Sequence, residues 1–248
     1  MKVALITGGA GAVGAAAARM LALDGFAVVL ADIKTDQTAA VGAEIERNGG
    51  KAIAITADLA DRDAPARIVG TVEKAFGRLD CLVNNAGRTG ASTIGSVDAD
   101  EWNAILGLNL TAPMLLCQRA APLMAAGGGG SIINVASRVY LSGTGVGYTS
   151  SKTGLIGLTR ALAVQLGKDN IRVNAVAPSF LNTPFNKRLV EQNSRLAESF
   201  KKMSPLNRVG APEDVAGAIA FLASDRASFI TGDVLHVCGG TQLAPQPD

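Results

Sequence analysis

Short, nearly all-apolar runs alternate along this chain with longer segments in which apolar residues recur at helical spacing. We expect strands at the short runs and helices at 64–76, 100–124, 147–166 and 212–222, with an earlier helix that ends near Leu23. Strands that are apolar on both faces and alternate with helices are typical of a parallel sheet covered on both sides. The pattern therefore predicts a doubly wound α/β fold with a seven-stranded parallel sheet, in one domain over residues 1–248. The expected strands are residues 3–6, 27–31, 52–55, 81–83, 131–135, 172–176 and 234–237.

Composition narrows the class of protein. The 248 residues are 48% hydrophobic and only 4% aromatic, which suits a core of small aliphatic side chains. A net charge of +2 without a basic stripe argues against a nucleic-acid partner. No apolar run reaches membrane-spanning length and no signal-peptide pattern precedes the first strand, so we expect no membrane partner and a cytoplasmic protein. The three cysteines and the single histidine, His236, have no metal-ligand spacing, so we expect no metal site.

A glycine-rich turn follows the first expected strand. Residues 8–14 read Gly-Gly-Ala-Gly-Ala-Val-Gly, and Gly9, Gly11 and Gly14 fit the G-x-G-x-x-G spacing. Glycines let the backbone approach a pyrophosphate, whose charge then meets the N-terminus of the following helix. This turn is the first crossover of a strand-helix-strand unit, so it predicts a dinucleotide site rather than a merely structural turn.

Asp32 ends the second expected strand. A carboxylate at this place can accept hydrogen bonds from the adenosine ribose hydroxyls, and it would repel a 2′-phosphate. We therefore expect NAD rather than NADP as the cofactor. The alternative is that Asp32 is a plain strand-end turn residue.

Tyr148 and Lys152 stand four residues apart, so on a helix both side chains share one face. A free tyrosine has a pKa of about 10, and a neighbouring ammonium favours the phenolate. A lysine and a cationic cofactor together could lower the pKa of Tyr148 enough to make it a general acid/base for an alcohol or a ketone. Such pairs also occur as ordinary neighbours on helix surfaces.

With these motifs the chain resembles the short-chain dehydrogenase/reductase family over essentially its whole length. Residues 84–87 read Asn-Asn-Ala-Gly, and residues 174–178 read Asn-Ala-Val-Ala-Pro. Asn109, Ser137, Tyr148 and Lys152 match the active-site residues of the family. The resemblance implies a Rossmann fold, and a substrate lid at about 183–205.

The family implies a role for each matching residue. Ser137 would hold the substrate oxygen and Tyr148 would exchange a proton with it. Lys152 would bind the nicotinamide ribose, and Asn109 would hold a water in a proton relay. The family also implies three groups of contacts with the cofactor. The end of the second strand contacts the cofactor, Asp58 and Leu59 contact its adenine, and the loop near Thr183 contacts its nicotinamide side. The expected cofactor-binding residues are Gly8, Gly9, Gly11, Ala12, Val13, Gly14, Asp32, Ile33, Asp58, Leu59, Asn85, Ala86, Gly87, Tyr148, Lys152, Pro178, Leu181 and Thr183.

Some of these residues have ordinary structural alternatives. Asn85 could simply tie strands together, Asn109 could be a satisfied core amide, and Ser137 could be a strand-end cap. The chain also departs from the family pattern. Ala12 replaces the middle glycine of the turn, and the loop from Ser137 to Tyr148 is shorter than in the family.

Two arginines follow site motifs directly. Arg88 comes after Gly87 and Arg138 after Ser137, near the expected mouth of the pocket. Both could attract an anionic group of a substrate. Arginines on loops are more often simply solvated.

The leading hypothesis is an NAD-dependent oxidoreductase that acts on a secondary alcohol or ketone of the polyol, sugar or hydroxy-acid type. One alternative is a reductase of 3-oxoacyl thioesters, which in similar sequences takes NADPH. Another is a non-enzymatic dinucleotide sensor. The small-molecule substrate is the only partner we expect besides copies of the chain, because apolar helix faces and the resemblance predict a homotetramer.

Overall fold

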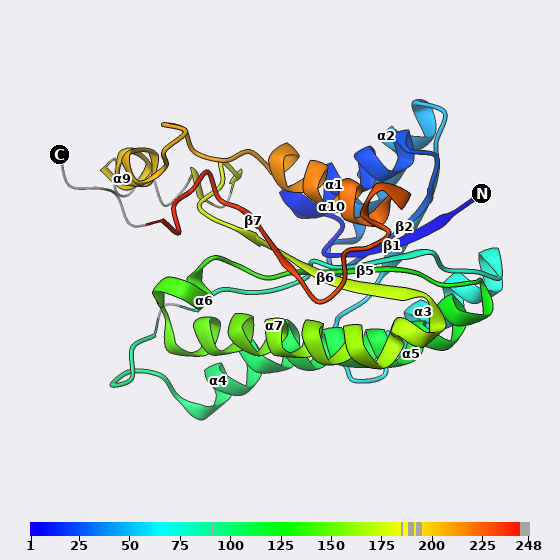
Figure 1. Ribbon diagram of the computed structural model, residues 1–248, viewed down its shortest axis with the longest axis horizontal. Coiled ribbons are helices and arrows are strands. Elements are labelled where there is room, and N and C mark those ends of the chain that lie inside the picture. The colour runs from blue at the N-terminus through cyan, green and yellow to red at the C-terminus, as the bar shows by residue number, and fades with distance from the viewer. Residues whose placement is uncertain (91, 185, 188–190, 192–194, 244–248) are drawn as a thin grey trace.

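A single parallel sheet organises the chain. The computed structural model describes residues 1–90, 92–184, 186–187, 191 and 195–243. The seven strands lie in the order β3-β2-β1-β4-β5-β6-β7, and every neighbouring pair is parallel, which confirms the predicted fold class (Figure 1). The strands are β1 (Val3–Thr7), β2 (Ala27–Asp32), β3 (Lys51–Thr56), β4 (Cys81–Asn84), β5 (Gly130–Val135), β6 (Ile171–Pro178) and β7 (Val234–Val237).

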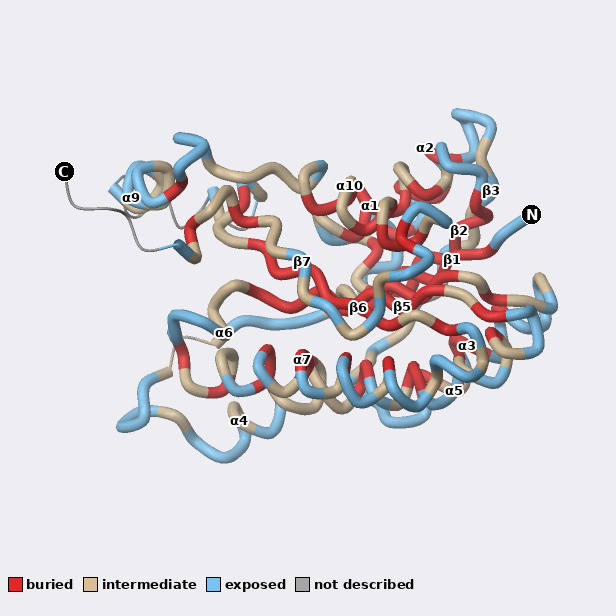
Figure 2. Tube along the Cα trace, in the orientation of Figure 1, coloured by how far each residue is buried: buried red, intermediate tan, exposed pale blue. Residues whose placement is uncertain are grey.

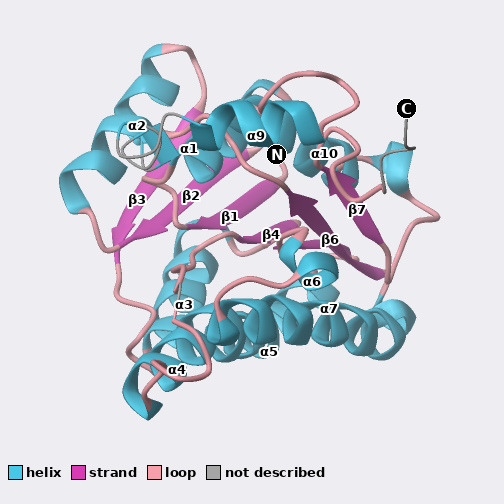
Figure 3. Cartoon of the chain, turned by 90° about the vertical axis from the view of Figure 1, so that its left-hand side faces the viewer, coloured by secondary structure: helices cyan, strands magenta, loops and turns pink. Residues whose placement is uncertain are grey.

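Helices cover both faces of this sheet. In Figure 1 one layer lies above the sheet and contains α1 (Ala12–Leu23), α2 (Thr35–Arg47) and α10 (Pro212–Ala223). The layer below contains α3 (Ala64–Phe76), α4 (Ala99–Leu106), α5 (Ala112–Ala126) and α7 (Val146–Leu166). The short helix α6 (Val139–Ser142) and the helix α9 (Arg195–Met203) lie at the end of the sheet that faces the viewer in Figure 3. Two short 3-10 helices are also present: η2 (Gly167–Asp169) follows α7, and η3 (Asp225–Ala227) follows α10.

The alternation of side chains along each strand builds two cores. Ala4 and Ile6 of β1 pack toward α1 and α10, whereas Val3 and Leu5 pack toward α3 and α5. Both cores consist mainly of aliphatic side chains. The strands β1, β2, β4, β5 and β6 are almost completely buried, whereas the edge strands β3 and β7 are partly exposed (Figure 2). This explains why the strands appear in the sequence as continuous apolar runs rather than alternating ones.

The expected helix at 100–124 is interrupted. Residues Gly107–Thr111 form a π-helix, η1, between α4 and α5. A π-helix inserts one extra residue into the helical ladder and often marks a functional site. Here it contains Asn109, which is fully buried. The apolar periodicity predicted the helices on both sides but not the bulge between them.

The four glycines at 127–130 form a tightly packed corner. Gly128 and Gly129 have φ angles of 95° and 108°, in the region that favours glycine. A Cβ on Gly129 would lie 2.2 Å from the Asn170 carbonyl oxygen, and one on Gly130 would lie 2.4 Å from that of Asp80. Their composition alone suggests a flexible turn, whereas the φ angles and contacts show that the four positions differ in how strictly they require glycine.

We predict that Gly129→Ala lowers the free energy of unfolding by at least about 2 kcal/mol, because it adds a backbone clash to an unfavourable φ. Gly128→Ala has nothing within 4 Å of the new Cβ, so it should cost only about 1–2 kcal/mol. Gly127 has a φ of −79° and should tolerate alanine or gain about 0.5 kcal/mol. Urea denaturation of the three variants measures the order, and equal stabilities would contradict it.

Candidate functional site

A cleft of about 820 Å³ opens at the carboxyl ends of β1, β2 and β4. The chain reverses direction across the sheet between β1 and β4, which is the position where open α/β sheets bind ligands. Most of the predicted cofactor residues line this cleft. They are Gly8, Gly11, Ala12, Val13, Asp32, Ile33, Asp58, Leu59, Asn85, Ala86, Gly87 and Thr183. The sequence prediction missed Ala10, Lys34, Gln37, Leu108 and Pro184, which line it as well.

The glycine turn is packed so closely that its backbone shape is fixed. Gly8 has a φ of 66°, and a Cβ on Gly14 would lie 2.2 Å from the Gly8 carbonyl oxygen. Gly11 precedes α1 and no side chain caps that helix end. The free N–H groups and the positive end of the helix dipole therefore face the cleft, where an anion would be stabilised. Ala12, the departure from the family pattern, is the first residue of α1.

Asp32 connects the strand end to the glycine turn. One carboxylate oxygen accepts a hydrogen bond from the Ala10 N–H at 3.0 Å, and the other accepts one from the Lys34 N–H at 3.0 Å. These bonds hold the carboxylate at the rim of the cleft. Each oxygen keeps a further lone pair for a ligand hydroxyl.

Asn85 joins β4 to β1. Its carboxamide donates hydrogen bonds to the carbonyl oxygens of Thr7 and Gly8, both at 3.0 Å. The Thr7 hydroxyl in turn accepts the N–H groups of Asn85 and Ala86. The structural alternative considered for Asn85 is therefore present, and the same bonds fix the wall of the cleft.

Lys152 is buried beside the cleft. Its ammonium donates a hydrogen bond to the Val135 carbonyl oxygen at 2.7 Å, and it lies 5.9 Å from the centre of the Tyr148 ring. Burial lowers the pKa of Lys152 to about 8, because water no longer stabilises its charge. Tyr148 and Lys152 do lie together on α7, as their spacing predicts.

The expected lowering of the Tyr148 pKa is not found in the protein alone. Burial raises the pKa of Tyr148, while a hydrogen bond with the Ser137 side chain acts in the opposite direction. Lys152 is not among the causes of this shift; its ammonium donates to the Val135 carbonyl oxygen and lies 5.9 Å from the centre of the Tyr148 ring. The joint effect of a lysine and a cationic cofactor on the pKa of Tyr148 stays a prediction. Ser137, which the family resemblance assigns to the substrate oxygen, is the serine that bonds the Tyr148 phenol.

Asn109 holds the loop after β4 in place. Its amide donates to the Arg88 carbonyl at 2.9 Å and to the Ser151 hydroxyl at 3.0 Å, and its carbonyl accepts the Arg88 N–H at 2.9 Å. Its side chain is thus fully engaged, as in a satisfied core amide. Gly87 lies next to both Asn109 and Lys152, because a Cβ on Gly87 would stand 3.1 Å from Asn109 Oδ1 and 3.6 Å from Lys152 Nζ.

Four predicted residues have other surroundings. A Cβ on Gly9 would meet Leu30 at 2.8 Å, so Gly9 allows the turn to pack on the sheet. Leu181 is buried in the upper core, and only its backbone remains for a ligand. Pro178 ends β6, and its carbonyl accepts the Arg138 N–H. Gly14 faces Gly8 rather than the cleft.

The sequence prediction also missed a buried amide chain behind Lys152. Asn84 donates to Asn134 at 2.8 Å, and Asn134 donates to the Thr159 hydroxyl at 2.9 Å. This chain links β4 and β5 to α7 below the lysine. A polar Asn134 inside an otherwise apolar strand is the sequence signal that could have revealed it.

The remaining candidates are resolved by their contacts. The His236 ring bonds the Tyr140 hydroxyl at 2.9 Å and stacks on its ring, which agrees with the expected structural role. In the part of the chain that the structure describes, no three His, Cys, Asp or Glu side chains gather as a metal site would need. None of the helices built from these residues has the length and hydropathy needed to cross a membrane.

The residues fit a dinucleotide at this site. The cleft has an uncapped helix N-terminus for a diphosphate, a carboxylate for ribose hydroxyls and, at its far end, a half-buried phenol and a buried ammonium. Gly8 and Gly14 let the turn pack closely on itself and on the loop after β4, and Gly87 leaves space beside Asn109 and Lys152.

We predict that the stability difference between the wild type and Lys152→Met changes with pH between about 8 and 10.5. In that window the unfolded lysine keeps its proton and the folded one loses it, so the wild type gains stability as the pH rises. The gain is absent in Lys152→Met. Urea denaturation from pH 7 to 10.5 measures it, with Lys168→Met, which removes an exposed lysine, as the control. A constant difference over this range would contradict the prediction.

Comparisons with known proteins agree with this architecture. A family model described as enoyl-(acyl carrier protein) reductase matches residues 8–242. The chain is 38% identical to the subunit BbsD of a hydroxy(phenyl)methylsuccinyl-CoA dehydrogenase from Thauera aromatica, covering 98% of this chain and 97% of that one. It is 39% identical to a 3-oxoacyl-(acyl-carrier-protein) reductase from Thermotoga maritima, covering 96% and 97%. A solved structure described as a NAD(P)-dependent gluconate 5-dehydrogenase from Beutenbergia cavernae, with bound NADP, superimposes with a TM-score of 0.91 at 36% identity, covering 97% and 96%. The chain belongs to the short-chain dehydrogenase/reductase family and is an oxidoreductase that acts on CH–OH groups.

Proposed function

We propose that the protein transfers a hydride between NAD(H) and a secondary alcohol or ketone of the polyol, sugar or hydroxy-acid type, with Tyr148 as general acid/base. One observation carries this proposal: Tyr148, which bonds Ser137, lies beside the buried Lys152, and the Lys152 ammonium lies next to Gly87 in the wall of the dinucleotide cleft. The site thus offers a proton donor next to a place for a hydride donor.

NAD is the cofactor that these residues favour. A carboxylate at the end of β2 suits two free ribose hydroxyls and repels a 2′-phosphate. The solved relative with bound NADP shows that members of the family also take the phosphorylated cofactor. The preference of this chain therefore depends on Asp32, which is held toward the cleft by its bonds to Ala10 and Lys34.

When bound, the cofactor supplies or accepts the hydride. The residues of the chain orient the substrate and move its proton. Ser137 holds the substrate oxygen by a hydrogen bond, close to the Tyr148 hydroxyl. Tyr148 donates its proton to that oxygen during ketone reduction and removes it during alcohol oxidation. The Lys152 ammonium has two donors left after its bond to Val135, and these suit ribose hydroxyls.

Burial of the phenol determines its resting state. The raised pKa of Tyr148 keeps it protonated at neutral pH, so it is ready to donate. Asn109 would hold a water of a proton relay through its main chain, since both N–H donors of its side chain are already bonded. The chain would form one domain over residues 1–248, with residues 183–205 as a lid over the substrate. Residues 185, 188–190 and 192–194 of that lid lie outside the described residues.

A reductase of 3-oxoacyl thioesters is the second candidate. The relative from Thermotoga maritima carries that activity in its description, at 39% identity. Asp32 argues against this candidate, because its carboxylate would repel the 2′-phosphate of NADPH, which those enzymes are expected to use. A non-enzymatic dinucleotide sensor is the weaker alternative, since such a protein would have no need for both Tyr148 and Lys152.

We further propose a homotetramer in the cytoplasm. Phe229 and Val164 are exposed to 103% and 84%, and such apolar side chains gain from burial between subunits. The family resemblance supports the number of subunits, and the reduced, buried cysteines suit the cytoplasm.

We predict that Tyr148→Phe reduces turnover by at least about 10²-fold, because the proton donor is lost. NAD binding, measured by calorimetry, should be largely kept. Tyr140→Phe is the matched control, since Tyr140 is the only other tyrosine and bonds His236. Turnover within a few-fold of wild type in Tyr148→Phe would refute the assigned role.

We predict that Asp32→Ser shifts the ratio of kcat/KM with NADP to that with NAD upward by roughly tenfold or more, a change of about 1.4 kcal/mol. The serine removes the charge that repels a 2′-phosphate. Asp24→Ser, a change at the distant end of α1, should leave the ratio unchanged. An unaltered ratio in Asp32→Ser would mean that another residue distinguishes the two cofactors.

A further inference from the structure

Arg138 is an unpaired cation beside the catalytic serine. The structure pairs Arg19, Arg67, Arg78 and Arg208 with carboxylates at 2.6–2.7 Å. Arg138 has no carboxylate within reach and no hydrogen-bond acceptor for its guanidinium among the described residues, although it is half-buried. A charge that is partly removed from water and left without a partner suggests that a ligand supplies one.

The backbone of Arg138 is fixed next to the reaction site. Its N–H donates to the Pro178 carbonyl at 2.9 Å, and it is the residue before α6. Consecutive Cα atoms are about 3.8 Å apart, so its side chain starts next to that of Ser137. The two side chains therefore start side by side, which allows one small ligand to contact both Ser137 and Arg138.

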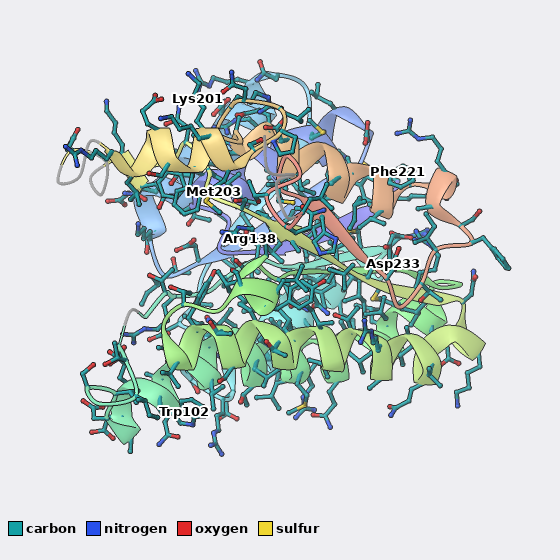
Figure 4. The ribbon with its side chains drawn as sticks, turned by 60° about the vertical axis from the view of Figure 1, so that its left-hand side comes forward. Trp102, Arg138, Lys201, Met203, Phe221 and Asp233 are labelled. Carbon is teal, nitrogen blue, oxygen red and sulfur yellow. The ribbon has the colours of Figure 1, made fainter. Side chains whose placement is uncertain are left out.

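The side chain of Arg138 lies under the lid. Its guanidinium carbon is 6.0 Å from the centre of the Phe200 ring on α9, and Figure 4 shows Arg138 between α6 and α9. Phe200 in turn stacks on Phe180 at 4.5 Å, with the rings nearly parallel at 5°. Contact with a ring uses the face of a guanidinium, whereas its N–H donors lie in its plane and remain free.

We propose, on the basis of the proposed function, that Arg138 binds a carboxylate that the substrate carries close to its reacting carbon. The planar fork of one guanidinium matches one carboxylate through two parallel hydrogen bonds. The ring pair of Phe180 and Phe200 provides an apolar wall beside it. The substrate is therefore a hydroxy acid or an oxo acid, and binding of its carboxylate connects the α6 turn to the lid helix.

A phosphate is the other anion that an arginine could take, for example from the carrier part of a thioester. Phosphate sites usually combine several cationic or backbone donors. Lys201, the neighbour of Phe200, lies on the outer side of α9 in Figure 4, away from Arg138. A single fork without a second cation beside it favours the carboxylate.

The test compares secondary hydroxy acids of three to seven carbons with their methyl esters, and includes 3-hydroxybutyryl-CoA. We expect wild-type kcat/KM to be at least about tenfold higher for an acid than for its ester, since hydrogen bonds to charged groups are the stronger ones. Arg138→Met should remove this preference, mainly through KM, and leave the activity with the ester. Arg138→Lys should restore part of the preference, because it keeps the charge and loses the fork.

Arg226→Met is the matched control. Arg226 also lies over a phenylalanine, at 5.9 Å from the centre of the Phe221 ring, but it is in η3, which follows α10, whereas Arg138 precedes α6. This variant should keep the preference for acids. An equal loss of activity with acids and esters in Arg138→Met would overturn the proposal, and so would a loss confined to the CoA thioester.

Binding distinguishes this proposal from the proposed function. The Tyr148→Phe protein, saturated with NADH, is titrated with the same acids and esters by calorimetry, with and without Arg138→Met. Binding of an acid that depends on Arg138 supports the proposal even if the wild type turns over none of the alcohols, an outcome that would reject the proposed function alone. Binding that is no tighter for any acid than for its ester overturns it.

Discussion

The buried ammonium of Lys152 is the constraint that the rest of the site depends on. A lysine in the interior must find acceptors for its protons or lose its charge, and the pKa of about 8 shows that burial is costly here. The protein supplies one acceptor, the Val135 carbonyl at the end of β5. The other two ammonium N–H groups have no acceptor among the described residues and suit the ribose hydroxyls of the proposed dinucleotide.

Several glycine, asparagine and aspartate residues fix the shape of the cleft around Lys152 and the glycine turn. Gly87 leaves the space between Asn109 and Lys152 that any side chain would fill. The chain of Asn84, Asn134 and Thr159 fixes α7 against β4 and β5, so the lysine cannot withdraw from the cleft. At the other end, Asp32 and Asn85 fix the glycine turn from two strands. The sheet thus holds the two ends of one elongated cleft at a constant separation.

The fold could be predicted from the sequence because parallel strands buried on both faces leave continuous apolar runs. The cleft could be predicted as well, since glycines and strand-end carboxylates have recognisable positions. Contacts between side chains far apart in sequence could not be predicted. The π-helix at Asn109 leaves no periodic signal, because one inserted residue looks like ordinary variation in an apolar helix. The direction of the Lys152 ammonium depended on the carbonyl of Val135, a backbone atom that no residue pattern shows.

That last difference changes the chemistry of the pair. If the lysine ammonium donated to the phenol oxygen, it would stabilise the phenolate and lower the pKa of Tyr148 in the protein alone. In the structure burial acts on both groups in the direction of the neutral form, raising the pKa of Tyr148 and lowering that of Lys152. A protonated phenol suits the donation step of ketone reduction directly. Alcohol oxidation needs the phenolate. The Lys152 ammonium keeps its charge in its bond to Val135 and lies 5.9 Å from the centre of the Tyr148 ring, so it would stabilise the phenolate together with the positive charge of the proposed oxidised cofactor.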